Sequence, residues 1–230
     1  PPHGSFERYY VDIANIRILL MSDVNEASQP QGRGELGGNP GGVVTRDTFD
    51  WWVDQVESNH SDKIIITAHH YLLKNTTVAT GEWEGMKRDV HGNWSTDYHG
   101  YYPSGTPHAA SYLYWVGGKP GSSEFETWLN ANPNKVDFWL GGHTHTNPDD
   151  KHGGKGHIEA GYGGVTFVNV SALTRWFVKS HAVPHSRLFT FEDGSDCAAI
   201  ECYMHSKDYR EQGFYPEKKK EIKLTKPFQI

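Results

Sequence analysis

The sequence is short of the residues that build several common classes of protein. Its 230 residues include only 2 cysteines, too few for a disulfide scaffold or a cysteine zinc site. The longest apolar run, 16–21, is interrupted by Arg17 and is far shorter than the roughly 18 residues that a membrane span needs. Acidic residues outnumber lysine and arginine by 28 to 22, a formal net charge of -6. A membrane protein is therefore excluded, and nucleic acid is disfavoured as a partner because it requires a basic face.

The two cysteines also say little about compartment. Cys197 and Cys202 are five residues apart in one predicted strand, so their side chains should face opposite sides of a sheet and should not form a disulfide. The localisation stays open. The chain starts with Pro1 rather than methionine, which suggests a processed product, a truncated version or a fragment.

Composition and periodicity indicate a folded α/β domain. Aromatic residues make up 13% and charged residues 22% of the chain, which excludes disorder. Apolar spacing and turn residues predict strands at 9–13, 16–23, 63–68, 136–140, 165–170, 188–191 and 198–204, and helices at 47–56 (with Asp47 as cap) and 122–131. Helices alternating with buried strands imply helices packed on a sheet. We expect one domain over 1–205, with an aromatic loop insertion at about 74–121, and a polar, basic extension over 206–230.

Histidines follow two of the predicted buried strands. His69 directly follows strand 63–68, and His143 and His145 follow strand 136–140 after two glycines. Sites in open α/β sheets collect at the carboxyl ends of strands, so these imidazoles can converge there. Converging imidazoles bind Zn, Mn, Fe or Ni. A structural interpretation stays open on spacing alone, because the chain has 14 histidines and one H-x-H pair is expected by chance.

Four segments in order resemble the calcineurin-like metallophosphoesterases. The run VDFWLGGHTH at 136–145 resembles the closing G-H-x-H motif of that family, and IIITAHH at 64–70 is similar to its preceding strand, which ends in a metal-binding histidine. Residues 9–25 resemble the family hairpin that follows its G-N-H motif, and 48–56 the helix between them. The fold that this implies is an α/β layered β-sandwich flanked by helices.

The resemblance implies metal-dependent hydrolysis of a small phosphate mono- or diester. Two divalent transition-metal ions (Mn, Fe, Zn or Ni) would activate a water molecule. His69 and His143 would bind one ion and His145 the other. His70 would be a substrate-side residue, as would His91 and His99 in the long loop.

The first half of the family pattern is absent from this sequence. No strand here ends in D-x-H, G-D-x-x-D or G-N-H-D/E, so the family's catalytic histidine would lie upstream. D-x-H does occur at 89–91 and 97–99, but neither follows an apolar strand, and loop residues are the favoured interpretation. We therefore expect the domain to lack its N-terminal half and to need a complementary half or another copy of the chain. The alternative is a degenerate, non-catalytic binding or assembly module.

One charge cluster lies outside this pattern. Residues 218–220 are three consecutive lysines in the polar C-terminal segment. A solvated face is the favoured interpretation, over a phosphate site.

Overall fold

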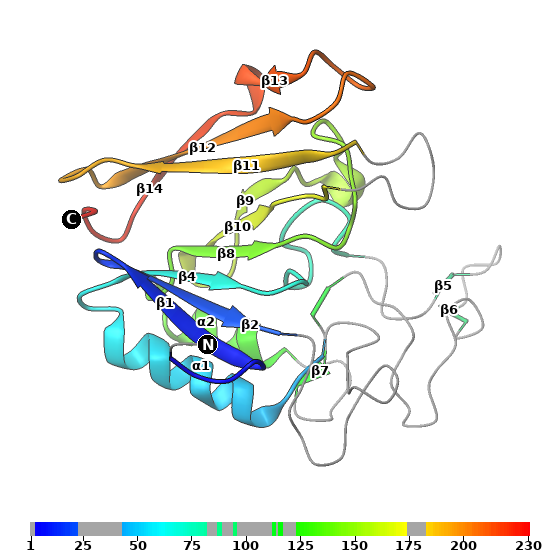
Figure 1. Cartoon of the computed structure of the whole chain (residues 1–230). Coiled ribbons are helices and arrows are strands. Elements are labelled where there is room, and N and C mark those ends of the chain that lie inside the picture. Colours follow the sequence, from blue (N-terminus) through cyan, green and yellow to red (C-terminus); the bar gives the residue numbers. More distant parts are fainter. Residues whose placement is uncertain are drawn as a thin grey trace.

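A computed structural model gives the fold in three layers (Figure 1). The residues that it describes are 3–22, 43–81, 87–88, 94–95, 112–113, 115–116, 123–173 and 183–230. Helices form the first layer, a mixed sheet the second and an antiparallel sheet the third.

The central layer is a six-stranded sheet. In spatial order it contains β1 (Arg8–Ile13), β2 (Ile16–Met21), β4 (Ile64–Ala68), β8 (Phe138–Gly141), β10 (Thr166–Asn169) and β9 (Ile158–Ala160). The four inner strands run parallel, while β1 and β9 pair antiparallel at the two edges. The carboxyl ends of the inner strands therefore meet along one side of the sheet. β4 is buried along nearly its whole length, as expected for a strand covered on both faces.

The two α-helices of the described part cover one face of this sheet (Figure 1). They are α1 (Arg46–Asn59) and α2 (Glu124–Ala131). Trp52 of α1, Phe125 of α2 and Trp139 of β8 are fully buried where the helices meet the sheet. Phe125 packs edge-on against both indoles, with ring centroids 5.0 and 5.1 Å apart, a geometry favoured by aromatic quadrupoles.

The second sheet covers the opposite face. It contains β11 (His185–Phe191), β12 (Cys197–Met204), β13 (Gly213–Phe214) and β14 (Lys220–Lys223), with β12 paired to the other three. β12 alternates strictly, and its buried side chains are Ala198, Ile200, Cys202 and Met204. The segment after residue 205 thus supplies β13, β14 and the short helix η4 (Pro216–Lys218) beside this sheet.

Short elements complete the described part. β3 (Val43–Val44) pairs with β7 (Trp115–Val116), and β5 (Lys87–Arg88) pairs with β6 (Trp94–Ser95). The short helices η2 (His152–Gly154) and η3 (Tyr162–Gly164) lie on either side of β9 in the chain.

The predicted α/β architecture with a helix-covered sheet is confirmed, and the two facing sheets are compatible with a sandwich. The predicted helix cap was wrong. Thr45 caps α1, since its hydroxyl accepts the backbone N–H of Thr48 at 3.1 Å, and Asp47 lies in the first turn. Cys197 is exposed, Cys202 is buried and both are free thiols, as predicted. No helix of the described residues is both long enough and apolar enough to cross a membrane.

Candidate functional site

A pocket of about 540 Å³ opens where the inner strands of the six-stranded sheet end. It is lined by Leu20, Met21, Ala68, His69, His70, Leu140, Gly141, Gly142, His143, His145, Val170, Ser171 and Ala172. The structure thus brings the three predicted metal ligands and the predicted substrate-side His70 to one place. The other two predicted substrate-side residues, His91 and His99, lie outside the described residues.

The end of β4 fixes His69 and exposes His70. The backbone N–H of His69 donates to the Leu140 carbonyl at 3.1 Å, which extends the pairing of β4 with β8 by one residue. The His69 side chain is 5% exposed, and its Nδ1 lies 3.2 Å from the Tyr71 carbonyl oxygen. The same Nδ1 lies 3.0 Å from the Tyr71 backbone nitrogen, whose N–H can only donate to an unprotonated Nδ1. The two contacts therefore favour opposite tautomers, and only the form with Nδ1–H coordinates a metal ion through Nε2. His70 is exposed at the pocket.

Two glycines at the end of β8 let the neighbouring loop approach closely. A Cβ on Gly141 would lie 2.7 Å from Leu72 Cγ, which is closer than any real contact. The Gly142 N–H donates to the His70 carbonyl at 2.9 Å. The sequence G-G before the histidines is therefore required by packing between the ends of two strands.

The histidines after these glycines have an unusual backbone. His143 has φ 64° and His145 has φ 39°, both in the left-handed region. Each such residue costs on the order of 1–2 kcal/mol without a glycine. Strain of this kind is kept where the surrounding structure holds a side chain for a purpose, so it marks the loop 143–145 as a candidate site.

The imidazoles interact directly across the pocket. His70 Nε2 lies 3.1 Å from His143 Nδ1, and the Tyr71 and His143 rings are 4.2 Å apart between centroids. Burial, together with the nearby His70, lowers the pKa of His145. His145 is therefore neutral at neutral pH, the form of histidine that binds metal ions.

Sequence reasoning missed the polar residues that hold this loop. Asn169 at the end of β10 is fully buried, and its amide donates to the Thr144 hydroxyl at 2.6 Å and accepts from the Ser171 N–H at 2.9 Å. Ser171 lines the pocket and also has a left-handed backbone, with φ 72°. The signal was present, since β10 is a third parallel strand ending at the same side of the sheet.

The donor set of the pocket consists of imidazoles alone. The pocket offers four imidazoles and, among the described residues that line it, no carboxylate. In the part of the chain that the structure describes, no three His, Cys, Asp or Glu side chains are grouped so that they could hold a metal ion. These residues alone therefore do not form a two-metal centre, although their imidazoles are suitable ligands for one completed by other groups.

No protein-family model matches this sequence, and no curated protein matches it significantly. The resemblance to the metallophosphoesterases therefore stays a prediction, and the function is argued below from the site.

Proposed function

We propose that the chain contributes to a metal-dependent phosphoesterase that hydrolyses a small phosphate mono- or diester. The observation that carries this proposal is that His69, His143 and His145 line one pocket at the ends of parallel strands. His69 and His143 would bind one divalent transition-metal ion (Mn, Fe, Zn or Ni), and His145 a second. The remaining ligands, including carboxylates, would come from outside the described residues, in a complementary N-terminal half or another copy of the chain.

Bound metal ions would polarise the phosphoryl oxygens and lower the pKa of a bound water. The described residues would act around them. His70 is exposed beside His143 and would hydrogen-bond the phosphoester. The buried Asn169 would keep the loop 143–145 in its left-handed conformation through Thr144.

The first experiment measures metal content and hydrolysis together. Protein purified without chelator is analysed by elemental mass spectrometry, and its hydrolysis of p-nitrophenyl phosphate and bis(p-nitrophenyl) phosphate is measured with added Mn²⁺. We expect His143→Ala to lower bound metal and to reduce the rate by at least about 100-fold, since a ligand is lost. The matched control is His152→Ala, an exposed histidine in η2 that does not line the pocket. A His143→Ala protein with the wild-type rate would refute the proposal.

A second candidate function is a non-catalytic binding or assembly module. It is favoured by the lack of a three-ligand group among the described residues. Because the enzyme would also lack metal without its complementary half, this module is supported over the enzyme only if the folded wild-type protein, purified together with any such half, holds almost no metal and hydrolyses neither ester.

A further inference from the structure

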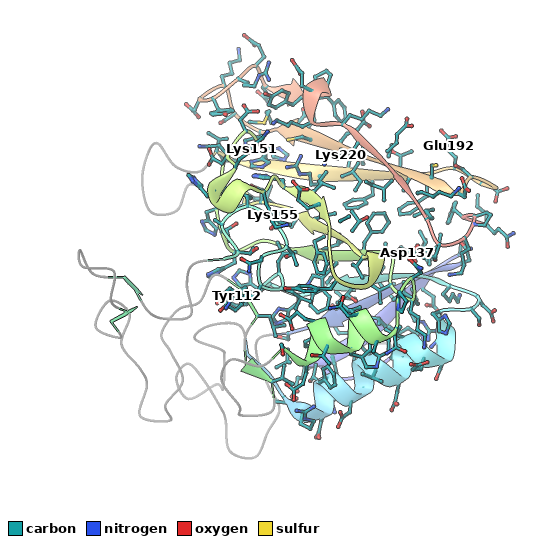
Figure 2. The ribbon with its side chains drawn as sticks, turned by 180° about the vertical axis from the view of Figure 1, so that it is seen from behind. Tyr112, Asp137, Lys151, Lys155, Glu192 and Lys220 are labelled. Atoms are coloured by element: carbon teal, nitrogen blue, oxygen red, sulfur yellow. The ribbon has the colours of Figure 1, made fainter. Side chains whose placement is uncertain are left out.

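A second cavity, of about 240 Å³, lies away from the histidine pocket. It is bordered by the segments around β9, by β11 and by the chain entering β14. Its lining residues include five cations, which are Lys151, Arg187, Lys218, Lys219 and Lys220. Figure 2 shows Lys151 and Lys220 on the same face of the molecule.

Arg187 is the unusual member of this lining. On β11 it shares one face of the strand with the inward-facing Phe189 and Phe191, so its side chain extends between the two sheets. Its Nε contacts the Asn169 carbonyl at 3.5 Å, and its Nη2 is fully buried with no hydrogen-bond acceptor in the described part of the chain. Burial lowers the pKa of Arg187. A buried cation without a counter-charge is costly, so this arrangement favours a bound anion.

His157, also in the lining, adds a neutral donor. Its Nε2 pairs with the Thr146 hydroxyl at 3.0 Å, while its buried Nδ1 has no partner among the described residues. Burial, reinforced by the charge of Arg187, lowers the pKa of His157 to about 2. The ring therefore stays neutral at neutral pH, and with Nε2 as acceptor it can donate through Nδ1–H.

Each of the four carboxylates in the lining accepts hydrogen bonds or forms an ion pair. Asp149 pairs with Lys218 at 2.6 Å and accepts from Tyr209 and Tyr215. Asp150 and Glu159 accept the backbone N–H groups of Asn147 and Gly156, and Glu217 pairs with Arg210 at 3.5 Å. Arg187, Lys151 and Lys219 have no carboxylate partner among the described residues. Five cations and four carboxylates leave the lining with a formal charge of +1, and the buried Arg187 has no ion pair in the described part of the chain.

We propose that this cavity binds a phosphate group, either inorganic phosphate or that of a small phosphorylated molecule. The Arg187 guanidinium would bind the phosphate oxygens and balance one negative charge of the phosphate. Lys151 and Lys219, at the exposed rim of the cavity, would balance the second. The site is independent of the histidine pocket and of any hydrolysis there.

The test is titration of the full chain with inorganic phosphate at constant ionic strength. Calorimetry measures the binding, and thermal unfolding at each phosphate concentration measures the stabilisation. We expect saturable binding and a rise in the unfolding temperature. Arg187→Met should weaken binding by about 10- to 100-fold, the loss expected for charge-assisted hydrogen bonds. Its unfolding temperature without phosphate should not fall, because removing an unpaired buried charge relieves a cost. The matched control is Lys155→Met, a lysine near the cavity but outside its lining.

Two further variants keep the result unambiguous. His143→Ala should bind phosphate at this cavity as the wild type does, which separates it from binding at the histidine pocket. If Arg187→Met does not fold, the double variant K151Q/K219Q changes only exposed side chains and should still weaken binding several-fold. Absence of wild-type binding would overturn the proposal, as would binding equal to the wild type by Arg187→Met or by K151Q/K219Q. Titration with a phosphorylated sugar then distinguishes a larger ligand from the free ion.

Discussion

At the scale of single residues, Glu126 is a buried carboxyl group on a helix that packs against the sheet. It lies on α2 and is 8% exposed. Burial raises its pKa to about 7, although backbone hydrogen bonds and the charge of Lys74 oppose the shift. At pH values between 4.5, the ordinary pKa, and about 7, the carboxyl is therefore protonated in the folded protein but ionised in the unfolded chain. Stability must fall as pH rises through that interval.

Replacing Glu126 with glutamine tests this directly. The full shift corresponds to at most roughly 3 kcal/mol. We expect Glu126→Gln to be more stable than the wild type by about 1–3 kcal/mol at pH 8, with the difference disappearing near pH 4.5. Urea denaturation at several pH values measures it. Asp54→Asn, an exposed carboxylate on α1, is the control and should change stability by less than about 0.5 kcal/mol at each pH. A difference independent of pH would contradict the assignment.

At the scale of elements, η3 holds the end of α2 by backbone contacts. The Asn134 N–H donates to the Gly163 carbonyl at 2.8 Å, and the Gly163 N–H donates to the Asn130 side chain at 3.1 Å. Gly163 has φ +60°, and a Cβ there would lie 2.2 Å from the Leu129 carbonyl oxygen. The position therefore requires glycine both for its backbone and for the space next to it.

Two glycine substitutions separate these requirements. Gly153 in η2 has φ +75° but no atom within 4 Å of its Cβ position. Gly153→Ala should therefore cost only about 1–2 kcal/mol, from the left-handed backbone. We expect Gly163→Ala to cost a further 1–3 kcal/mol or so, from overpacking against α2. Chemical denaturation of both variants gives the difference, and equal losses would show that the contact with Leu129 is relieved at little cost.

The sequence predicted the helices and strands better than it predicted their exact ends or their tertiary contacts. α1 was found because Phe49, Trp52 and Val56 fall on one helical face, a pattern that is local in the chain. Its start was misplaced because the cap Thr45 also bonds to Glu7, a strand-edge residue far away in sequence. Such partners depend on the tertiary fold and leave no periodic signal.

The candidate site was likewise predictable in its position but not in its local conformation. Histidines at strand ends could be placed together, since parallel strands end at one side of a sheet. The left-handed backbone of His143 and His145 could not be predicted, because the residues beside it are held from the end of β10, by Asn169 through Thr144 and by Ser171 through the Thr146 carbonyl. Arg187 was missed because the predicted strand began at residue 188 and charged residues usually face solvent, whereas β11 begins at His185 and turns Arg187 between the sheets.

At the scale of the whole molecule, the C-terminal segment joins the two sheets. Buried Asp137, which precedes β8, accepts the Ile65 N–H at 3.0 Å and the Thr225 N–H at 2.7 Å. This one carboxylate thus ties β4 of the central sheet to the chain leaving β14. Farther on, Asn15 in the β1–β2 turn and Gln229 exchange hydrogen bonds. The segment 224–230 therefore closes the end of the sandwich opposite the histidine pocket.

Phe228 is the apolar anchor of this closure. It is 8% exposed in the core between the sheets, with its ring 5.7 Å from that of Phe191, while Ile230 is 94% exposed. We expect Phe228→Ala to lower the free energy of unfolding by about 3 kcal/mol, from lost burial and the cavity left behind. Ile230→Ala, two residues away, should change it by less than about 0.5 kcal/mol. Hydrogen exchange should then show faster opening at Asn15 and Thr225 in Phe228→Ala than in the wild type, because both segments depend on this anchor. If Phe228→Ala unfolds like Ile230→Ala, the segment lies on the sandwich without stabilising it, and the two sheets are held together by their own side chains alone.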